Sequence, residues 1–173
     1  MTRARYAAAM EALYVACIAV SGASLVVITL IIPYGVFMRY ALNAPASWPE
    51  PAAVLLMIVF SFIGGAAVYR ANVHIAVQAL VERAGPRARV VLRRLVDLAM
   101  VLTALFMLVW GLQLVRTTWH QVIAEFPVLS VGLTYLPLPA GGLLSLLFIV
   151  ERLWVGEPPV TSVMYRDRAE ALE

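Results

Sequence analysis

Long uncharged stretches alternate with short polar ones along this chain. Four stretches contain no charged residue; they are 27, 19, 18 and 25 residues long and cover residues 12–38, 51–69, 98–115 and 126–150. About 20 helical residues cross the roughly 30 Å hydrocarbon core of a membrane at 1.5 Å per residue. Each stretch is therefore long enough, or nearly so, for one crossing, and none is long enough for two. The pattern predicts an all-α polytopic membrane protein, a single membrane domain over residues 1–173, with four spans at about 12–36, 51–70, 95–117 and 133–154.

The segments between these spans are short. Residues 74–81 mix apolar side chains with Gln78, which predicts a short amphipathic cytoplasmic segment between the second and third spans. Pro51 suits the first turn of the second helix, where its missing N–H costs nothing. Pro137 and Pro139 predict a kink in the fourth span. Residues 156–173 are polar, and we expect them to form a flexible cytoplasmic tail.

Composition supports the membrane assignment. The chain is 63% hydrophobic and 13% charged, whereas soluble domains carry roughly 25% charged residues. Cys17 is the single cysteine, so an intramolecular disulfide and a cysteine-based zinc site are both excluded. The first apolar run is longer than the roughly 7–15 residues of a cleaved signal peptide. We therefore interpret it as a retained helix, with Cys17 as a packing residue.

Arginine placement predicts the orientation. All thirteen basic residues are arginines; eleven fall on the side of the two termini and of the segment between spans two and three, and only Arg39 and Arg116 fall on the other. The positive-inside rule then places both termini in the cytoplasm of a bacterial inner membrane. Each arginine near an anionic leaflet adds about 1 kcal/mol of attraction. Four arginines before the third span are candidates for lipid headgroup contacts: Arg87, Arg89, Arg93 and Arg94.

Candidate chemistry is sparse, and we predict neither an enzyme nor a bound cofactor or metal. The predicted spans lack interior charges that would mark an ion path. Asp97 follows Arg93 and Arg94 at helical spacing, which favours a local ion pair. His74 and His120 suggest a haem, but the topology separates them by roughly the 30 Å membrane core. A haem shared with another subunit stays open.

Small residues in two spans suggest close helix packing. Ser61 and Gly65 have small-xxx-small spacing, with Gly64 beside them, and Gly141 and Ser145 repeat the spacing in the fourth span. Such spacing lets helix backbones approach closely. It fits internal packing of the four helices, and it also fits docking onto a partner membrane protein.

One ordered set of residues carries a family resemblance. Along residues 39–75 the set is Arg39-Tyr40, Asn43, Trp48, Glu50, Phe62-Ile-Gly-Gly-Ala-Ala67, Arg70 and His74-Ile75. This set resembles the small membrane subunit of the tripartite ATP-independent periplasmic (TRAP) transporters, and Leu136-Pro-Leu-Pro139 resembles the start of that family's fourth helix. The likeness covers about residues 10–154. It departs at Pro51, where the family has a second glutamate, and at Ala71-Asn72, where an Arg-Gly is usual.

The resemblance implies a non-enzymatic subunit of a secondary transporter. In that family a large membrane subunit carries substrate and sodium by an elevator-type mechanism, the small subunit is its scaffold, and a periplasmic solute-binding protein delivers an organic acid. Arg39, Trp48 and Glu50 are then candidates for contacts with these partners, although a tryptophan belt and a helix N-terminal acid are ordinary at a membrane surface. The full set of candidate interface residues is Arg39, Trp48, Glu50, Ser61, Gly64, Gly65, Arg70 and His74.

Two other functions remain open from the residues alone. A membrane anchor of a respiratory or redox complex predicts a bound haem or quinone. A stand-alone small channel or exporter predicts transport by this chain without a partner.

Overall fold

A computed structural model describes residues 3–71 and 86–156 of the chain. Within these residues four helical stretches are long and apolar enough to cross a membrane: Arg3–Tyr40, Pro49–Arg70, Val90–Thr118 and Val131–Trp154. The all-α architecture with four apolar helices is therefore confirmed. The amphipathic segment expected at 74–81 and the tail expected at 156–173 lie outside the described residues, apart from Gly156.

The elements follow one another in the order helix, helix, helix, hairpin, short helix, helix. They are α1 (Arg3–Tyr40), α2 (Pro49–Arg70), α4 (Pro86–Thr118), β1 (Val122–Ile123), β2 (Phe126–Ser130), α5 (Val131–Tyr135) and α6 (Pro137–Trp154). At 1.5 Å per residue the 22 residues of α2 measure about 33 Å, close to the thickness of the hydrocarbon core. The 38 residues of α1 measure about 57 Å, so α1 extends beyond that core.

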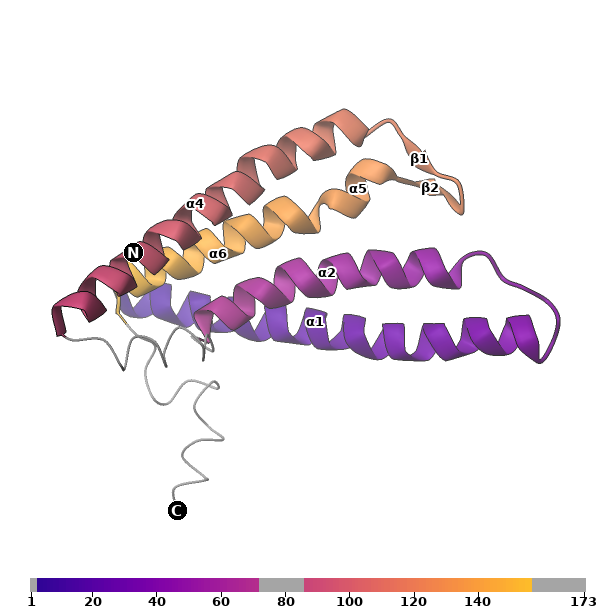
Figure 1. Ribbon diagram of the computed structural model, residues 1–173, viewed down its shortest axis with the longest axis horizontal. Helices are drawn as coiled ribbons and strands as arrows, with labels where there is room; N and C mark the ends of the chain where they lie inside the picture. The colour runs from indigo at the N-terminus through magenta and orange to yellow at the C-terminus, as the bar shows by residue number, and fades with distance from the viewer. Residues whose placement is uncertain (1–2, 72–85, 157–173) are drawn as a thin grey trace, which may run out of the picture.

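The four long helices form two antiparallel pairs, α1 with α2 and α4 with α6 (Figure 1). Helix α2 also packs against α6, so α2 and α6 form the middle of the molecule and are flanked by α1 and α4. We call the end with Arg3, Arg70 and Trp154 the terminal end. The opposite end, with residues 41–48 and 119–130, is the loop end. In Figure 1 the two pairs lie close together at the terminal end and diverge toward the loop end.

Neighbouring glycines bring α6 against both of its partners. A Cβ added at Gly141 would lie 2.7 Å from the Phe62 carbonyl oxygen of α2, and one added at Gly142 would lie 2.8 Å from the Ala104 carbonyl oxygen of α4. Both separations are too short for a real side chain, so only glycine permits this backbone approach. The Gly141–Ser145 spacing in the fourth span therefore serves packing inside the chain.

The fourth span is interrupted where its prolines predicted. Helix α5 ends at Tyr135 and α6 begins at Pro137, with Leu136 between them. Proline at the start of α6 suits a position whose N–H has no helical partner. The predicted kink near Pro137 and Pro139 is confirmed.

A short β-hairpin at the loop end was not predicted. Val122 pairs with Ser130 and Ile123 with Phe126 in antiparallel register. The hairpin is fixed at its base, because the Val131 N–H donates to the Gln121 carbonyl oxygen at 2.8 Å and Ser130 caps α5 through the Gly132 N–H.

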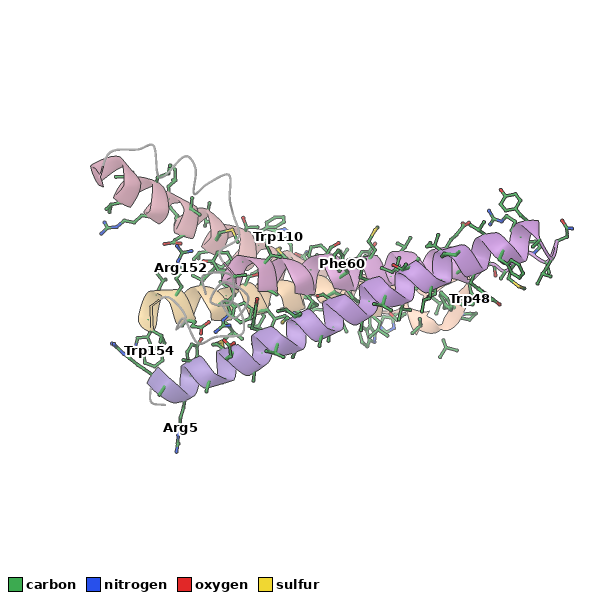
Figure 2. All side chains as sticks on the ribbon, turned by 90° about the horizontal axis from the view of Figure 1, so that it is seen from below. Arg5, Trp48, Phe60, Trp110, Arg152 and Trp154 are labelled. Atoms are coloured by element: carbon green, nitrogen blue, oxygen red, sulfur yellow. The ribbon has the colours of Figure 1, made fainter. Side chains whose placement is uncertain are left out.

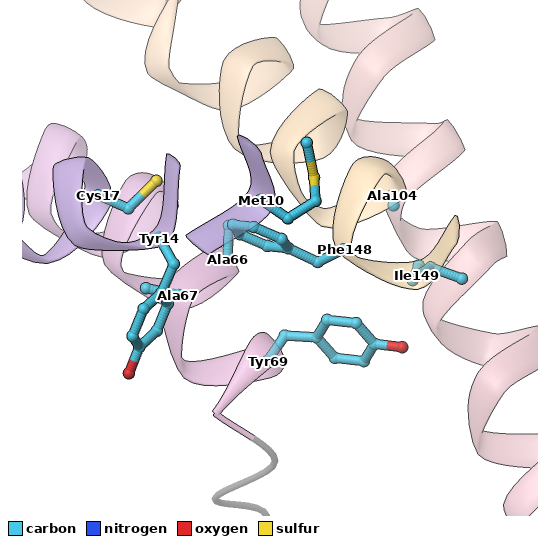
Figure 3. Close-up of a cluster of buried hydrophobic side chains, with 9 residues drawn as sticks. All are labelled: Met10, Tyr14, Cys17, Ala66, Ala67, Tyr69, Ala104, Phe148 and Ile149. Carbon is cyan, nitrogen blue, oxygen red and sulfur yellow. The ribbon is translucent and has the colours of Figure 1, made fainter. Parts of the chain in front are cut away.

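The buried core lies in the half of the molecule nearer the terminal end. Figure 3 shows side chains of α1, α2, α4 and α6 converging there: Met10, Tyr14, Cys17, Ala66, Ala67, Tyr69, Ala104, Phe148 and Ile149. Cys17 is 3% exposed, so its predicted packing role is confirmed. Beyond Ser24, α1 contains no buried residue. Most other large apolar side chains point outward, as expected for helices that face lipid or another membrane protein.

Candidate functional site

A buried ion cluster connects three helices at the terminal end. The Arg70 guanidinium of α2 donates from Nε to Glu151 Oε2 at 2.7 Å and from Nη2 to Glu151 Oε1 at 2.8 Å. It also donates from Nη1 to Glu11 Oε2 at 2.7 Å. Glu151 belongs to α6 and Glu11 to α1. Arg70 therefore binds one carboxylate with the two-pronged geometry typical of strong arginine pairs, and a second carboxylate with its remaining nitrogen.

The surroundings of this cluster keep its charges away from solvent. The side chains of Arg70 and Glu151 are 2% and 4% exposed, and that of Glu11 is 27% exposed. The guanidinium carbon lies 5.0 Å from the centre of the Tyr14 ring and 5.7 Å from that of Phe148, within the range of cation–π contacts. Removing one partner of a buried pair costs about 3–5 kcal/mol, because the other charge stays buried without compensation. The arrangement fits a structural centre better than a reactive site.

This burial differs from the surface position expected for Arg70. From the sequence, Arg70 was expected to contact a partner, and Glu11 and Glu151 were not singled out because each lies just outside an uncharged run. One feature of the sequence could have pointed to them. Each of these acids lies within one turn of an apolar run, at the same predicted membrane face as Arg70. Their meeting depends on the rotation of three helices, which a single sequence does not reveal.

A second ion pair links α4 to α6. Arg152 Nη1 lies 3.6 Å from Asp97 Oδ1, and both side chains are half-buried. The sequence favoured a local pair of Asp97 with Arg93 or Arg94; the structure pairs Asp97 with a different helix. Arg94 is exposed, and the side chains of Arg87, Arg89 and Arg93, like residue His74, lie outside the described residues.

The loop end brings together three predicted interface residues. Arg39, in the last turn of α1, donates from Nη2 to Glu50 Oε1 at 3.0 Å, and Glu50 lies in the first turn of α2. Trp48 precedes that helix and packs against Tyr34, with ring centres 5.7 Å apart. Unlike Arg70, this pair is open to the surroundings, because the side chains of Arg39 and Glu50 are 49% and 71% exposed.

Tryptophans mark both ends of the molecule. Figure 2 shows Trp48 toward the loop end, and Arg5 and Trp154 at the terminal end. The Trp154 ring meets Tyr6 of α1 edge-on at 5.6 Å between centres. Twenty residues separate Glu50 from Arg70, about 30 Å along α2. The two ion-paired ends of α2 are thus about one hydrocarbon thickness apart.

The small residues of α2 divide between two surfaces. A Cβ at Gly64 would lie 3.1 Å from Ser21 Oγ, so Gly64 packs against α1. A Cβ at Gly65 would meet nothing within 4 Å, and Ser61 one turn before it is also exposed. Three larger apolar residues of α2 are exposed near these two. We call the whole set the α2 outer face; it consists of Val54, Met57, Ser61, Gly65 and Val68.

The described residues contain little that could hold a metal or perform catalysis. Among residues 3–71 and 86–156, no three side chains of histidine, cysteine, aspartate or glutamate are grouped to bind a metal ion. His120 is exposed at the loop end, two residues after α4.

Two comparisons with known proteins found matches to this chain. Residues 28–157 match the family described as "Tripartite ATP-independent periplasmic transporters, DctQ component". The chain is also similar to a Haemophilus influenzae protein named "Putative TRAP transporter small permease protein". The two are 26% identical over 149 residues, which cover 83% of this chain and 86% of that protein.

Proposed function

The chain belongs to the DctQ family, the small permease components of TRAP transporters, and from this premise we propose that it holds the large membrane subunit in place during ion-coupled uptake of an organic acid. It is a transporter subunit and not an enzyme. The family implies two partners, a large membrane subunit and a periplasmic solute-binding protein. This assignment replaces the alternatives of a redox anchor and a stand-alone channel.

The α2 outer face is the observation that carries the scaffold proposal. Gly64, Gly141 and Gly142 each lie against a neighbouring helix of this chain, whereas a Cβ at Gly65 would meet nothing within 4 Å and Ser61 is exposed. Exposed small residues at helical spacing, here Ser61 and Gly65, let a partner helix approach closely inside the membrane. The large subunit is the family partner that spans the membrane, so we assign this face to it.

The proposed interface is tested by comparing two exposed glycines. Gly65→Leu should reduce recovery of the large subunit at least tenfold when the small subunit is purified from native membranes. Gly22→Leu on α1 is the matched control, because a Cβ at Gly22 also meets nothing within 4 Å. Full recovery with both variants contradicts the proposed interface, and equal loss with both shows that it is not specific to α2.

We assign the loop end to the periplasm and both termini to the cytoplasm. The arginine distribution supports this orientation, and the headgroup role of Arg87, Arg89, Arg93 and Arg94 follows from it. Because Cys17 is buried, new cysteines at Ala4 and Ser47 report accessibility with little background. A membrane-impermeant thiol reagent applied to intact spheroplasts should label Ser47→Cys and not Ala4→Cys. The reverse pattern would overturn the orientation.

The exposed loop-end group of Arg39, Trp48 and Glu50 then faces the periplasmic partner. Its ion pair is accessible, and charged groups at a rim mainly steer encounter and fix orientation. We propose that this group helps the solute-binding protein to dock. Arg39→Ala should lower uptake without lowering the amount of assembled transporter, and unchanged uptake would count against this role.

A further inference from the structure

The hairpin at the loop end is unusually apolar for a connection between two spans. With histidine counted as neutral, Glu125 is the one charged residue between residues 117 and 150. The uncharged run of residues 126–150 therefore begins in β2, before the helical stretch Val131–Trp154. Figure 1 shows the hairpin projecting from the ends of α4 and α5. No function described above uses it.

Large apolar side chains of this connection point outward. Val128 is 96% exposed, Val122 is 65% exposed, and Trp119 at the base of the hairpin is 48% exposed. Pro127, next to Val128, is exposed as well. Several exposed apolar side chains on one short segment mark a contact with a membrane or with another protein.

The two spans that flank the hairpin set its depth. Asp97 of α4 and Arg152 of α6 are ion-paired at 3.6 Å, so they mark the same level at the terminal end. Thr117 lies twenty residues after Asp97, and Gly132 lies twenty residues before Arg152; each interval is about 30 Å at the helical rise. The hydrocarbon core is also about 30 Å thick. The residues between Thr117 and Gly132 therefore leave the spans where the core ends.

Hydrogen bonds and close packing hold the hairpin at this level. Ser130 Oγ donates to the Trp119 carbonyl oxygen at 2.5 Å and accepts from the Gly132 N–H at 3.1 Å. A Cβ added at Gly132 would lie 2.7 Å from the Val115 carbonyl oxygen, so α5 packs directly on the end of α4. The strands are thus fixed to both spans.

We propose that the hairpin lies in the lipid leaflet at the loop end, at the boundary between headgroups and acyl chains. Val122 and Val128 contact lipid there, and Trp119 occupies the depth at which tryptophan is enriched in membrane proteins. The open edges of a two-stranded sheet keep it out of the hydrocarbon core, where their backbone groups would have no partner. Glu125, in the turn, stays in water. The contact holds for either orientation of the chain and does not depend on the proposed transport role.

Spin labels on the hairpin test this depth in the complete transporter, reconstituted in liposomes of phosphatidylethanolamine and phosphatidylglycerol. Val128→Cys and Glu125→Cys replace exposed side chains, and the native Cys17 is buried. Oxygen concentrates in the bilayer, whereas nickel ethylenediaminediacetate stays in water. The ratio of label collisions with oxygen to those with the nickel chelate should be several-fold higher at Val128→Cys than at Glu125→Cys. Ser47→Cys, in the other loop at this end, is the control for a label in water.

Two results of the labelling would overturn the proposal. Equal ratios at Val128→Cys and Ser47→Cys would place the hairpin in water. Poor access of both reagents to Val128→Cys would show that a protein surface covers the strand.

A measurement without labels checks that the spin label does not itself draw the hairpin into lipid. The fluorescence component lost in Trp119→Phe should be quenched by lipids brominated near the headgroup more strongly than by lipids brominated near the chain end. Quenching of that component by iodide in water, with no effect of either lipid, would contradict the lipid contact.

Discussion

The two ends of α2 carry the same ion pair chemistry in opposite surroundings. At the terminal end Arg70 is 2% exposed and bound to two carboxylates from two other helices. At the loop end Arg39 and Glu50 are 49% and 71% exposed and join helices that are already consecutive in the chain. The first pair fixes how distant helices pack, whereas the second adds little to packing and remains accessible to a partner. Burial, not residue type, separates the structural role from the proposed functional one.

The largest effect is expected from breaking the buried cluster. Arg70→Leu leaves Glu151 buried without its cation, which should lower the free energy of unfolding by about 3–5 kcal/mol. SDS titration of the purified chain in mild detergent measures this change, and the amount of protein in the membrane should fall with it. Exchanging the charges, with Arg70→Glu and Glu151→Arg together, should recover part of the loss. A loss below about 1 kcal/mol, typical of a surface pair, would remove the contrast between the two ends.

A smaller loss is expected when the charge is kept but its geometry is changed. Arg70→Lys retains a cation but cannot bind Glu151 with two parallel hydrogen bonds while also reaching Glu11. Hydrogen bonds to charged groups contribute about 1.5–3 kcal/mol, so a loss in this range is expected. The same titration measures it. If Arg70→Lys left the free energy of unfolding unchanged, the positive charge alone would explain the stability of the cluster.

The half-buried pair between α4 and α6 should rank next. Asp97→Asn removes the charge facing Arg152 at 3.6 Å and should cost roughly 1 kcal/mol, the upper end for partly exposed pairs. Thermal unfolding at low and high salt measures it, with a small salt dependence expected because the site is partly screened from ions. A loss as large as that of Arg70→Leu would make Asp97 part of the structural centre.

The smallest effect on stability is expected at the loop end. Arg39→Ala should change the free energy of unfolding by about 0–1 kcal/mol, and added salt should weaken even this contribution. The measurement is the SDS titration used for Arg70. A loss above about 2 kcal/mol would be atypical of an exposed pair and would show that the loop end also holds the fold together.

The sequence predicted those features that depend on one helix at a time. The lengths of the uncharged stretches predicted the four spans, and Pro137 and Pro139 predicted the break in the fourth. Contacts between helices were harder to predict, because they depend on how each helix is rotated about its axis and shifted along its neighbour. Glu11 and Glu151 were not singled out, and Asp97 was expected to form a local pair although it faces Arg152. The hairpin at residues 122–130 has a weak sequence pattern, since β1 is two residues long and β2 contains Pro127, a residue that is uncommon inside strands.

The positions of the candidate interface residues were predicted in part. Arg39, Trp48 and Glu50 were grouped through the family resemblance, and they lie at the same end of the molecule, where Arg39 pairs with Glu50 and Trp48 packs against Tyr34. The small residues of α2 were recognised, but only the structure separates Gly64, which packs on α1, from Gly65, which packs on nothing in the chain. The sequence places both glycines on α2, but it does not show which neighbouring helix each glycine contacts.

We infer that the terminal end builds the fold while the loop end serves the partners. The most direct test is binding-protein-dependent uptake by proteoliposomes that contain both membrane subunits, with Arg39→Ala and Glu50→Ala combined in the small subunit. Uptake is divided by the amount of assembled transporter, and the free energy of unfolding of the variant is measured beside it. We expect lower uptake per transporter, with the free energy of unfolding changed by no more than about 1 kcal/mol. Full uptake per transporter, or a loss of stability equal to that of Arg70→Leu, would contradict it.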